Sequence, residues 1–376
     1  MIPFHIPYIS GNELLFVKDA MTKRTFSGGG YYTKACEDWL ENYTKANKIL
    51  LTSSCTHSLE MCALLCNIQP GDEVIMTSFN FVSAANAFVL RGAKIVFVDV
   101  DPVSMNIDEG LIPAAISSRT KAIVVMHYGG IACNMDVIMD LAEKAGVWVV
   151  EDAAHCIGAF YKGQHLGTIG HMGTLSFHAT KNIHCGEGGA LLINDGRFIA
   201  QAEIIREKGT NRNAFLRGEI DRYTWKSIGS SYLMNELSAA FLYGQLKHLE
   251  LVNKKRTKLK NLYVQELCGL QDFISLPPDS DENQGNCHLF FIKVKEKGKR
   301  DTLIENLASN WSIQTAFHYL PLHSTEIGVE KGCFLGNDRY TTLGSEAIVR
   351  LPLYFDLQEQ EVEEISKALR NEFLKA

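Results

Sequence analysis

Short apolar runs alternate with longer amphipathic stretches along the first two thirds of this chain. The runs are rich in β-branched residues, and the stretches between them carry the three- to four-residue apolar spacing of helices. Seven runs stand out, at residues 48–51, 73–76, 94–98, 122–126, 147–150, 174–177 and 190–193. This alternation is typical of βαβ units, so we predict an α/β fold with one large, mostly parallel sheet of seven strands.

The pattern changes after residue 234. A charged and apolar stretch at 235–267 predicts two helical segments that lead into a second domain. Beyond Pro277-Pro278, further strands and helices are expected at 288–294, 303–308, 312–319 and 359–371. A chain of 376 residues is long enough for two cores. We therefore expect a large domain over residues 1–248 and a smaller C-terminal α/β domain over 249–376.

The composition gives no indication of nucleic-acid or membrane partners. The formal net charge is -6 at pH 7, whereas nucleic-acid binding calls for clustered Lys and Arg. No stretch approaches the roughly 20 apolar residues of a membrane helix. The N-terminus lacks the basic and apolar regions of a secretory signal. Ten cysteines without a Cys-x-x-Cys pair indicate reduced thiols, so a cytoplasmic location is expected.

An aspartate and a lysine follow two of the apolar runs. Asp152 comes after the run at 147–150, and Lys181 follows the run at 174–177 and precedes a glycine-rich segment. Pyridoxal phosphate needs a lysine amine that holds it as a Schiff base and a carboxylate that keeps its pyridine nitrogen protonated. A solvated loop lysine and a helix-capping aspartate are the structural alternatives, but the two residues together fit this cofactor.

Other polar and aromatic residues follow the same set of runs. In an open α/β sheet, ligands bind at the carboxyl ends of the strands, so these residues are expected to meet there. The turn at 53–57 and the hydroxyl of Ser176 fit a phosphate, although helix capping explains the turn equally well. His155 and Phe81 fit the faces of a planar ring, although core residues of these types are common.

Four histidines between residues 165 and 184 raise the question of a metal site. His165, His171, His178 and His184 do not have a metal-binding pair spacing such as His-x-x-x-His, and no carboxylate pattern completes a set of ligands. We therefore expect no metal.

With these residues assembled, the chain resembles the DegT/DnrJ/EryC1/StrS family of pyridoxal phosphate-dependent sugar aminotransferases, which have the aspartate aminotransferase-like fold type I. The resemblance runs essentially from end to end. Its most specific segments are Glu151-Asp152-Ala153-Ala154-His155, the segment 176–182 and Gly186-Glu187-Gly188-Gly189.

The resemblance implies a role for each candidate residue. Lys181 would carry the cofactor and act as the catalytic acid and base, Asp152 would pair with the pyridinium nitrogen, and His155 would lie beside the ring. The remaining positions are implied to bind the phosphate or to stack on the ring: Thr56, His57 and Ser176 for the phosphate, Phe81 for stacking, and Ser231 for the phosphate of a partner subunit, where many members carry asparagine. A homodimer with shared active sites is therefore implied.

The resemblance also implies a substrate class. Family members move an amino group from an amino donor, here L-glutamate, to a nucleotide-linked keto sugar. Segments 204–212, 223–225, 229–234 and 317–323 are similar to the branch that aminates C4 of dTDP-4-keto-6-deoxy-D-glucose and gives dTDP-4-amino-4,6-dideoxygalactose for the enterobacterial common antigen or O-antigen.

One alternative product and two alternative functions are compatible with the same fold. The C4 epimer, dTDP-4-amino-4,6-dideoxyglucose, is an open alternative product. A non-catalytic binding or regulatory protein of the same fold is an alternative function. Sugar dehydratases of the family carry histidine in place of the lysine, so Lys181 argues against that third activity.

Overall fold

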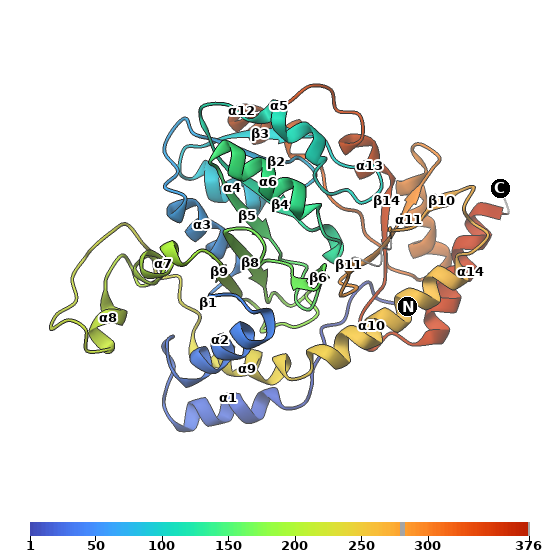
Figure 1. Cartoon of the computed structure of the whole chain (residues 1–376). Coiled ribbons are helices and arrows are strands. Elements are labelled where there is room, and N and C mark those ends of the chain that lie inside the picture. The colour runs from blue at the N-terminus through green and yellow to red at the C-terminus, as the bar shows by residue number, and fades with distance from the viewer. Residues whose placement is uncertain (279–282, 375–376) are drawn as a thin grey trace.

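Eight strands form the largest sheet in the computed structural model, which describes residues 1–278 and 283–374 (Figure 1). Their spatial order is β1-β9-β8-β5-β4-β2-β3-β13. The bounds are β1 Lys48–Thr52, β2 Glu73–Thr77, β3 Lys94–Val98, β4 Thr120–Met126, β5 Trp148–Asp152, β8 Met172–Ser176, β9 Gly189–Ile193 and β13 Gly332–Phe334. Neighbouring strands are parallel except that β9 is antiparallel to both β1 and β8. The expected mostly parallel sheet is confirmed.

All seven predicted strands are present, and β13 is an eighth that the sequence pattern did not indicate. It lies beyond residue 330 and pairs in parallel with Ile95–Phe97 of β3. The C-terminal part of the chain therefore adds a strand to the large sheet. The domain boundary at 248/249 stays a prediction; helix α9 (Glu236–Leu246) ends just before it and α10 (Leu249–Glu266) begins just after it.

Helices cover both faces of the large sheet (Figure 1). Leu50 of β1 packs in a cluster with residues of α3 (Cys55–Leu65), α4 (Val82–Val89) and α7 (Ile199–Arg206). Its neighbours Ile49 and Leu51 belong to the cluster on the other face, which includes residues of α2 (Tyr31–Thr44), α5 (Ile112–Ala115), α6 (Met135–Ala145) and α9. Because successive strand residues point to opposite faces, an almost continuous apolar run serves both layers.

A second, antiparallel sheet forms a separate core in the C-terminal part. It contains β10 (Ile274–Ser275), β12 (Phe290–Val294) and β14 (Ile348–Leu351), with β12 in the centre. Its cluster includes residues of α10, α11 (Lys299–Trp311) and α14 (Glu359–Leu374). The strand or helix expected at 312–319 is wrong, because that segment makes only isolated bridges at Ile313 and Ala316. The rest of the segment, including His318 and Tyr319, forms neither helix nor strand.

The remaining elements are short. A small sheet has the order β11 (Asn283–Gln284), β6 (Phe160–Tyr161) and β7 (Gln164–His165). Helix α1 (Glu13–Thr22) packs against α9. Helix α12 (Glu326–Lys331) packs against β13, and α13 (Thr341–Ala347) packs against β12 and α11. None of the helices in the described part of the chain combines the length and apolar character needed to cross a bilayer.

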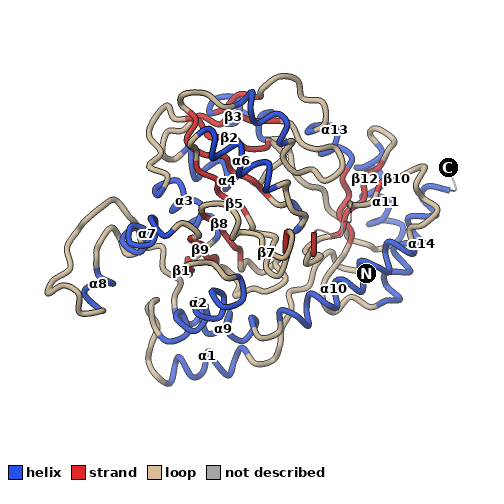
Figure 2. The backbone as a smooth tube through the Cα atoms, in the orientation of Figure 1, coloured by secondary structure: helices blue, strands red, loops and turns tan. Residues whose placement is uncertain are grey.

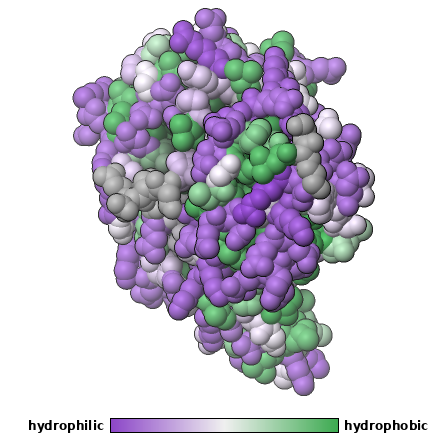
Figure 3. All heavy atoms as spheres, turned by 90° about the vertical axis from the view of Figure 1, so that its right-hand side faces the viewer, coloured by the Kyte–Doolittle hydropathy of each residue, from purple (hydrophilic) through white to green (hydrophobic). Residues whose placement is uncertain are grey.

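The segment between α7 and α9 projects from the body of the molecule (Figures 1 and 2). It contains the short helix α8 (Arg212–Leu216) and several exposed apolar side chains, which are Phe215, Leu216, Tyr223, Trp225 and Ile228. By contrast, Figure 3 shows that hydrophilic residues cover most of the C-terminal face, with apolar residues in smaller patches.

Candidate active site

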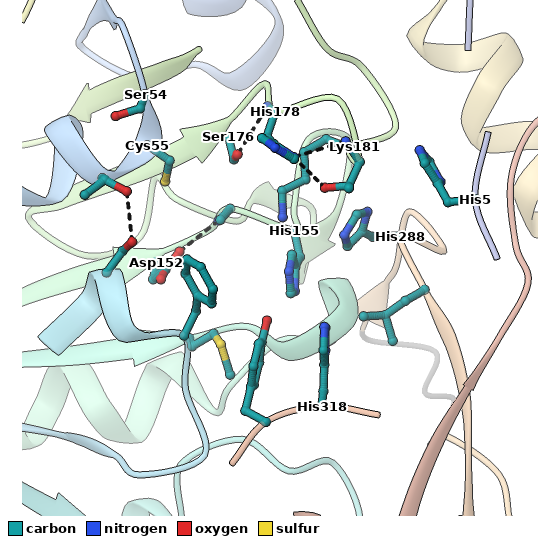
Figure 4. Close-up of a pocket in the computed structure, with 18 of the residues that line it drawn as sticks. His5, Ser54, Cys55, Asp152, His155, Ser176, His178, Lys181, His288 and His318 are labelled. Atoms are coloured by element: carbon teal, nitrogen blue, oxygen red, sulfur yellow. Dashed lines mark hydrogen bonds between the residues drawn. The ribbon is translucent and has the colours of Figure 1, made fainter. Parts of the chain in front are cut away.

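A cavity of about 530 Å³ opens at the carboxyl ends of β5 and β8, beside the N-terminus of α3. Residues from both cores line it, so it lies where the C-terminal part meets the large sheet. The lining includes most of the candidates from the sequence, namely Thr56, Phe81, Asp152, His155, Ser176 and Lys181 (Figure 4). The folding of the sheet thus brings together residues that are up to 125 positions apart, as expected for a parallel α/β fold.

Lys181 projects into this cavity from the loop that follows β8 (Figure 4). Its backbone N–H donates to the carbonyl of His178 at 2.9 Å, which fixes the turn that presents the side chain. Burial lowers the pKa of Lys181 to about 8, and the charge of Arg350 acts in the same direction while Asp152 opposes it. A lysine with this pKa is partly neutral near physiological pH, and only the neutral amine is a nucleophile or a base.

Asp152 is the last residue of β5 and is 5% exposed. Its Oδ1 accepts a hydrogen bond from the N–H of Ala154 at 3.1 Å. Burial raises the pKa of Asp152, while the Ala154 hydrogen bond and the charge of Lys181 lower it. A carboxylate has about four lone-pair sites, so this group has acceptor capacity left on the cavity side. A pyridinium N–H of the cofactor is a donor of the required kind.

The N-terminus of α3 and the end of β8 provide a site for an anion. Ser54 caps the helix by accepting the N–H of His57 at 3.1 Å, and the preceding first-turn N–H groups have no intrahelical acceptors. Thr56 and Ser176 line the cavity here with their neighbours. The start of β9 packs closely against this helix N-terminus and leaves no room for a side chain at Gly189, because a Cβ there would lie 2.4 Å from the backbone nitrogen of Cys55. These donors fit the phosphate of the cofactor.

His57 and Ser231 lie apart from the other candidates. His57 is not among the residues that line the cavity; its N–H is held by Ser54 and its Nδ1 lies 2.7 Å from Ser53 Oγ. Ser231 lies in the projecting segment and lines a separate depression with Lys208 and Arg212. Within one chain, Ser231 therefore does not meet Lys181.

Three histidines stand along one wall of the cavity, and only His155 was expected. The ring of His155 lies 4.4 Å from that of His288 and 6.4 Å from that of His318, in the latter case nearly parallel. His155 Nδ1 accepts the N–H of Gly129 at 3.2 Å, so its proton lies on Nε2. Burial, followed by the charge of Lys181, lowers the pKa of His155 and keeps its ring neutral. A neutral planar ring of this kind can pack on a cofactor ring.

His288 connects the cavity wall to the lysine loop. Its Nδ1 lies 3.0 Å from Oδ1 of Asn182, the residue that follows Lys181, while the Asn182 amide donates to the carbonyl of Asn286 at 3.0 Å. Since the Asn182 oxygen can only accept, His288 donates through Nδ1. This bond ties the loop that carries Lys181 to the start of β12.

Aromatic side chains border the cavity on the side of Phe81. The Phe81 ring is 55% exposed and lies 6.2 Å from that of Tyr319. Tyr319 in turn stacks on His318 with ring centres 4.0 Å apart. The position of Phe81 allows it to contact a planar ligand, and its stacking role stays a prediction.

The other histidines near the lysine make hydrogen bonds within the protein. His165 Nε2 accepts the N–H of Gly158 and His171 Nδ1 accepts that of Val149, each at 2.9 Å. No cluster of His, Cys, Asp and Glu suited to a metal ion occurs within residues 1–278 and 283–374.

Comparison with known proteins identifies the type of site. The family model of the DegT/DnrJ/EryC1/StrS aminotransferases matches residues 7–370. The chain belongs to this family. The chain is also similar to the spore coat polysaccharide biosynthesis protein SpsC of Bacillus subtilis. The two are 30% identical over 98% of this chain and 96% of SpsC.

Solved structures agree with the family assignment. The aminotransferase TlmJ from Streptoalloteichus hindustanus is 27% identical with a TM-score of 0.92, covering 100% of this chain and 99% of TlmJ. Spr1654 from Streptococcus pneumoniae in its PMP form is 25% identical with a TM-score of 0.92, covering 99% of this chain and 98% of Spr1654. The PLP form of Spr1654 has a TM-score of 0.90. The expected fold type I, the transaminase class and the pyridoxal phosphate cofactor are thereby confirmed.

Proposed function

We propose that this aminotransferase moves the amino group of L-glutamate to C4 of dTDP-4-keto-6-deoxy-D-glucose. The products would be 2-oxoglutarate and dTDP-4-amino-4,6-dideoxygalactose. The observation that carries the proposal is the presence of Lys181 and Asp152 in one cavity, with hydroxyl groups and a helix N-terminus beside them. The nucleotide sugar rests on the similarity of segments 204–212 and 317–323 to the branch of the family that uses it.

The cofactor would be held by the residues that the cavity brings together. Lys181 would bind it covalently, Asp152 would hold its ring nitrogen in the protonated form, and Ser176 with the turn at Thr56 would bind its phosphate. When bound, pyridoxal phosphate supplies an electron sink for the carbon that loses a proton. His155 and Phe81 would contact the two faces of its ring.

Lys181 would then carry the proton in both halves of the reaction. Its amine takes the proton from Cα of glutamate in the first half and delivers a proton to C4 of the sugar in the second. A pKa of about 8 suits both tasks, because the group exchanges protons readily near neutral pH. The side of the sugar ring that faces Lys181 decides between the galacto product and its gluco epimer, which is the alternative product.

The protein would act as a homodimer. The projecting segment at 207–233 exposes Phe215, Leu216 and Trp225, a set of apolar side chains that a second copy of the chain would cover. From that segment Ser231 would reach the phosphate in the partner's site. Light scattering should give a mass of two chains, and Ser231→Ala should weaken cofactor binding about 10-fold, as expected for the loss of one hydrogen bond to a charged group.

A decisive experiment is conversion of dTDP-4-keto-6-deoxy-D-glucose by the purified holoenzyme with L-glutamate. NMR assignment of the configuration at C4 separates the two epimers, and formation of neither amino sugar overturns the proposed substrate. Lys181→Ala should abolish turnover, whereas Lys144→Ala on the exposed face of α6 should retain it. The dTDP-4-amino-4,6-dideoxygalactose would be made in the cytoplasm. It would serve there as a building block for the enterobacterial common antigen or an O-antigen.

A non-catalytic binding protein of the same fold, the alternative function that the sequence left open, does not agree with the transaminase class of the family. It predicts that borohydride treatment leaves no cofactor adduct on Lys181 and that glutamate does not change the absorption spectrum of the bound cofactor. The aminotransferase predicts the opposite result in both measurements.

A further inference from the structure

Lys181 lies in a loop that regular secondary structure does not hold. The loop runs from the end of β8 at Ser176 to the start of β9 at Gly189, and Lys181 belongs to neither a strand nor a helix. In the proposed reaction its amine serves two carbons, Cα of the donor and C4 of the sugar. A proton transfer needs the two heavy atoms within about 3 Å of each other. The backbone beneath the side chain therefore has to be held by other contacts.

The side chain of Asn182 makes such contacts directly beside Lys181. It is 2% exposed and does not line the cavity. Its amide nitrogen donates to the carbonyl of Asn286 at 3.0 Å and to Oδ1 of Asn253 at 2.8 Å. Its Oδ1 accepts a hydrogen bond from Nδ1 of His288 at 3.0 Å. Both amide hydrogens and the amide oxygen of Asn182 are thus used within the protein.

Backbone carbonyls fix the orientation of all three asparagine amides. The amide nitrogen of Asn286 donates to the carbonyls of His155 and Ile157, at 2.8 and 2.9 Å. The amide nitrogen of Asn253 donates to the same carbonyl of Ile157 at 3.2 Å. A carbonyl accepts a hydrogen bond and cannot donate one, so each NH₂ group has to face its carbonyl. The carbonyl of Asn286 orients the amide of Asn182 in the same way.

These hydrogen bonds join separate parts of the chain. The asparagine cluster consists of Asn182, Asn253, Asn286 and His288. Asn182 belongs to the lysine loop, Asn253 to α10, and the other two residues to the segment that leads into β12. Through the carbonyls of His155 and Ile157, the cluster also reaches the loop that follows β5. The loops that follow β5 and β8 are therefore both tied to the C-terminal part.

A role that is limited to joining the two cores does not require this chemistry. Apolar side chains would join them at lower cost, because a buried amide is tolerated only when its polar atoms are paired. Hydrogen bonds are directional, and a fully paired buried network makes its surroundings rigid. The cluster acts on the residue next to Lys181 and on the carbonyl of His155. Both of these residues line the cavity.

We propose that Asn182 is a positioning residue for Lys181, an inference that rests on the proposed aminotransferase function. Through Asn253, Asn286 and His288, it fixes the backbone of the lysine loop. The amine of Lys181 then reaches both Cα of the donor and C4 of the sugar, while only its side chain moves. Asn182 itself contacts neither substrate nor cofactor, because it lies outside the lining of the cavity.

The test measures the donor half-reaction of the holoenzyme, with L-glutamate and no sugar. Asn182→Ala should slow the change in cofactor absorbance at saturating glutamate by about 10- to 100-fold, as expected when a reacting group is displaced by about 1 Å. The apparent Kd for glutamate should stay within a few-fold of the wild type. In the variant, glutamate deuterated at Cα should react several-fold more slowly than ordinary glutamate, because proton transfer by Lys181 is the slowed step. Asn182→Gln should recover part of the rate.

A second variant and a control separate positioning from stability. Asn253→Ala removes one acceptor of the Asn182 amide from outside the cavity, and it should slow the same step by about 2- to 10-fold, as expected for one lost hydrogen bond. This variant decides the question if Asn182→Ala does not fold. Asn194→Ala is the matched control. The amide of Asn194 also donates to two carbonyls, those of Gly167 and Gly170, but at the end of β8 away from the cavity. Its loss should destabilise the fold without slowing the half-reaction.

A second readout needs neither cofactor nor substrate. In the cofactor-free protein, amide hydrogen exchange of the peptide 177–188 should be about 10-fold faster in Asn182→Ala than in the wild type, as measured by mass spectrometry. In Asn194→Ala that peptide should exchange as in the wild type. Unaltered exchange or an unaltered half-reaction in Asn182→Ala would overturn the inference. Equal slowing in Asn194→Ala, or a slowed reaction without a deuterium effect, would also overturn it.

These outcomes are separate from the identity of the substrates. A failure to aminate dTDP-4-keto-6-deoxy-D-glucose would overturn the proposed acceptor, while the half-reaction would still report on Asn182. If L-glutamate did not change the absorbance of the wild type, the proposed donor would be wrong. The exchange of the peptide 177–188 would then still decide whether Asn182 fixes the lysine loop.

Discussion

The Nε2 of His127 lies 3.0 Å from Oε2 of Glu151, the residue before Asp152 in β5, and both side chains are fully buried. The Glu151 carboxylate also accepts the backbone N–H groups of Gly167, Ile169 and Gly170 at 2.5 to 2.7 Å. It thereby holds the loop that leads into β8 against the end of β5. The acid beside the proposed cofactor-binding aspartate therefore has a positioning role.

Glu151→Ala should lower the free energy of unfolding strongly. The substitution leaves three backbone N–H groups, two of them buried, and the buried imidazole of His127 without their acceptor, and breaking a buried pair costs about 3 to 5 kcal/mol. Urea denaturation of the cofactor-free protein measures the change. Glu363→Ala on the exposed side of α14 should change it by less than about 0.5 kcal/mol, and an equally small change for Glu151→Ala would contradict this account.

The seven strands from β1 to β9 in the large sheet were predictable because they are largely buried on both faces and form apolar, β-branched runs in the sequence. β13 was not, because three residues of which the first is glycine carry no periodic signal. Its pairing with β3 joins positions more than 230 residues apart, which depends on how the C-terminal segments fold back. The segment at 312–319 is irregular although the sequence predicts regular structure there, and His318 and Tyr319 at its end line the cavity.

The site was predictable where it is local in sequence. Asp152 and Ser176 end two neighbouring parallel strands of one sheet and Lys181 follows the second of them, so the position of ligands at the carboxyl ends of strands brings the three together. His288, His318 and Arg350 come from the C-terminal part, and although His318 lies in the segment 317–323 that resembles a branch of the family, no pattern in the sequence places these three residues at the cavity. Arg350 had one signal, since it is the single charge in the apolar run Ile348-Val349-Arg350-Leu351-Pro352-Leu353.

The ionisation of Lys181 gives a pH-dependent prediction. Burial lowers its pKa from the ordinary 10.5 to about 8. In the cofactor-free protein, acetylation of Lys181 by a trace of acetic anhydride should reach half its maximal rate near pH 8, as read by mass spectrometry. In urea the midpoint should return toward 10.5.

The lowered pKa of Lys181 also makes the free energy of unfolding depend on pH. Between pH 8 and 10.5 the unfolded chain holds the Lys181 proton and the folded chain has released it, so this group makes the fold more stable as pH rises. Lys181→Met should therefore make the rise in the free energy of unfolding between pH 8 and 10.5 smaller than in the wild type, and an unchanged rise would contradict the assignment. Part of the rise should remain in the variant, because burial also lowers the pKa of Lys293 to about 8.

Asp152→Asn should slow the glutamate half-reaction by about 100- to 1000-fold. An amide cannot keep the ring nitrogen of the cofactor protonated, so a charge interaction that acts on the transition state is lost. Stopped-flow absorbance measures the rate, and the bound cofactor is quantified separately. Asp195→Asn, at the end of β9 outside the cavity, is a matched strand-end control that should stay within a few-fold of the wild type.

The buried carboxylate of Asp99 anchors the C-terminal segment that precedes α13. It accepts the N–H groups of Arg339 at 2.9 Å and Thr341 at 2.8 Å, and the hydroxyl of Thr341 at 2.6 Å. Burial by itself raises the pKa of Asp99, but these hydrogen bonds outweigh it and lower the pKa below 3.8. The contribution to stability is therefore present above pH 3.8 and is lost as the pH falls through the lower, folded-state pKa.

Asp99→Asn should thus lower the free energy of unfolding by about 2 to 3 kcal/mol at pH 7, because an amide oxygen replaces a charged acceptor of several donors. The difference from the wild type should narrow as the pH falls below 3.8. Urea denaturation at a series of pH values tests both statements. Asp272→Asn, at an exposed position, should show neither effect. A loss that stays constant down to the lowest pH would mean that Asp99 acts through packing and not through its charge.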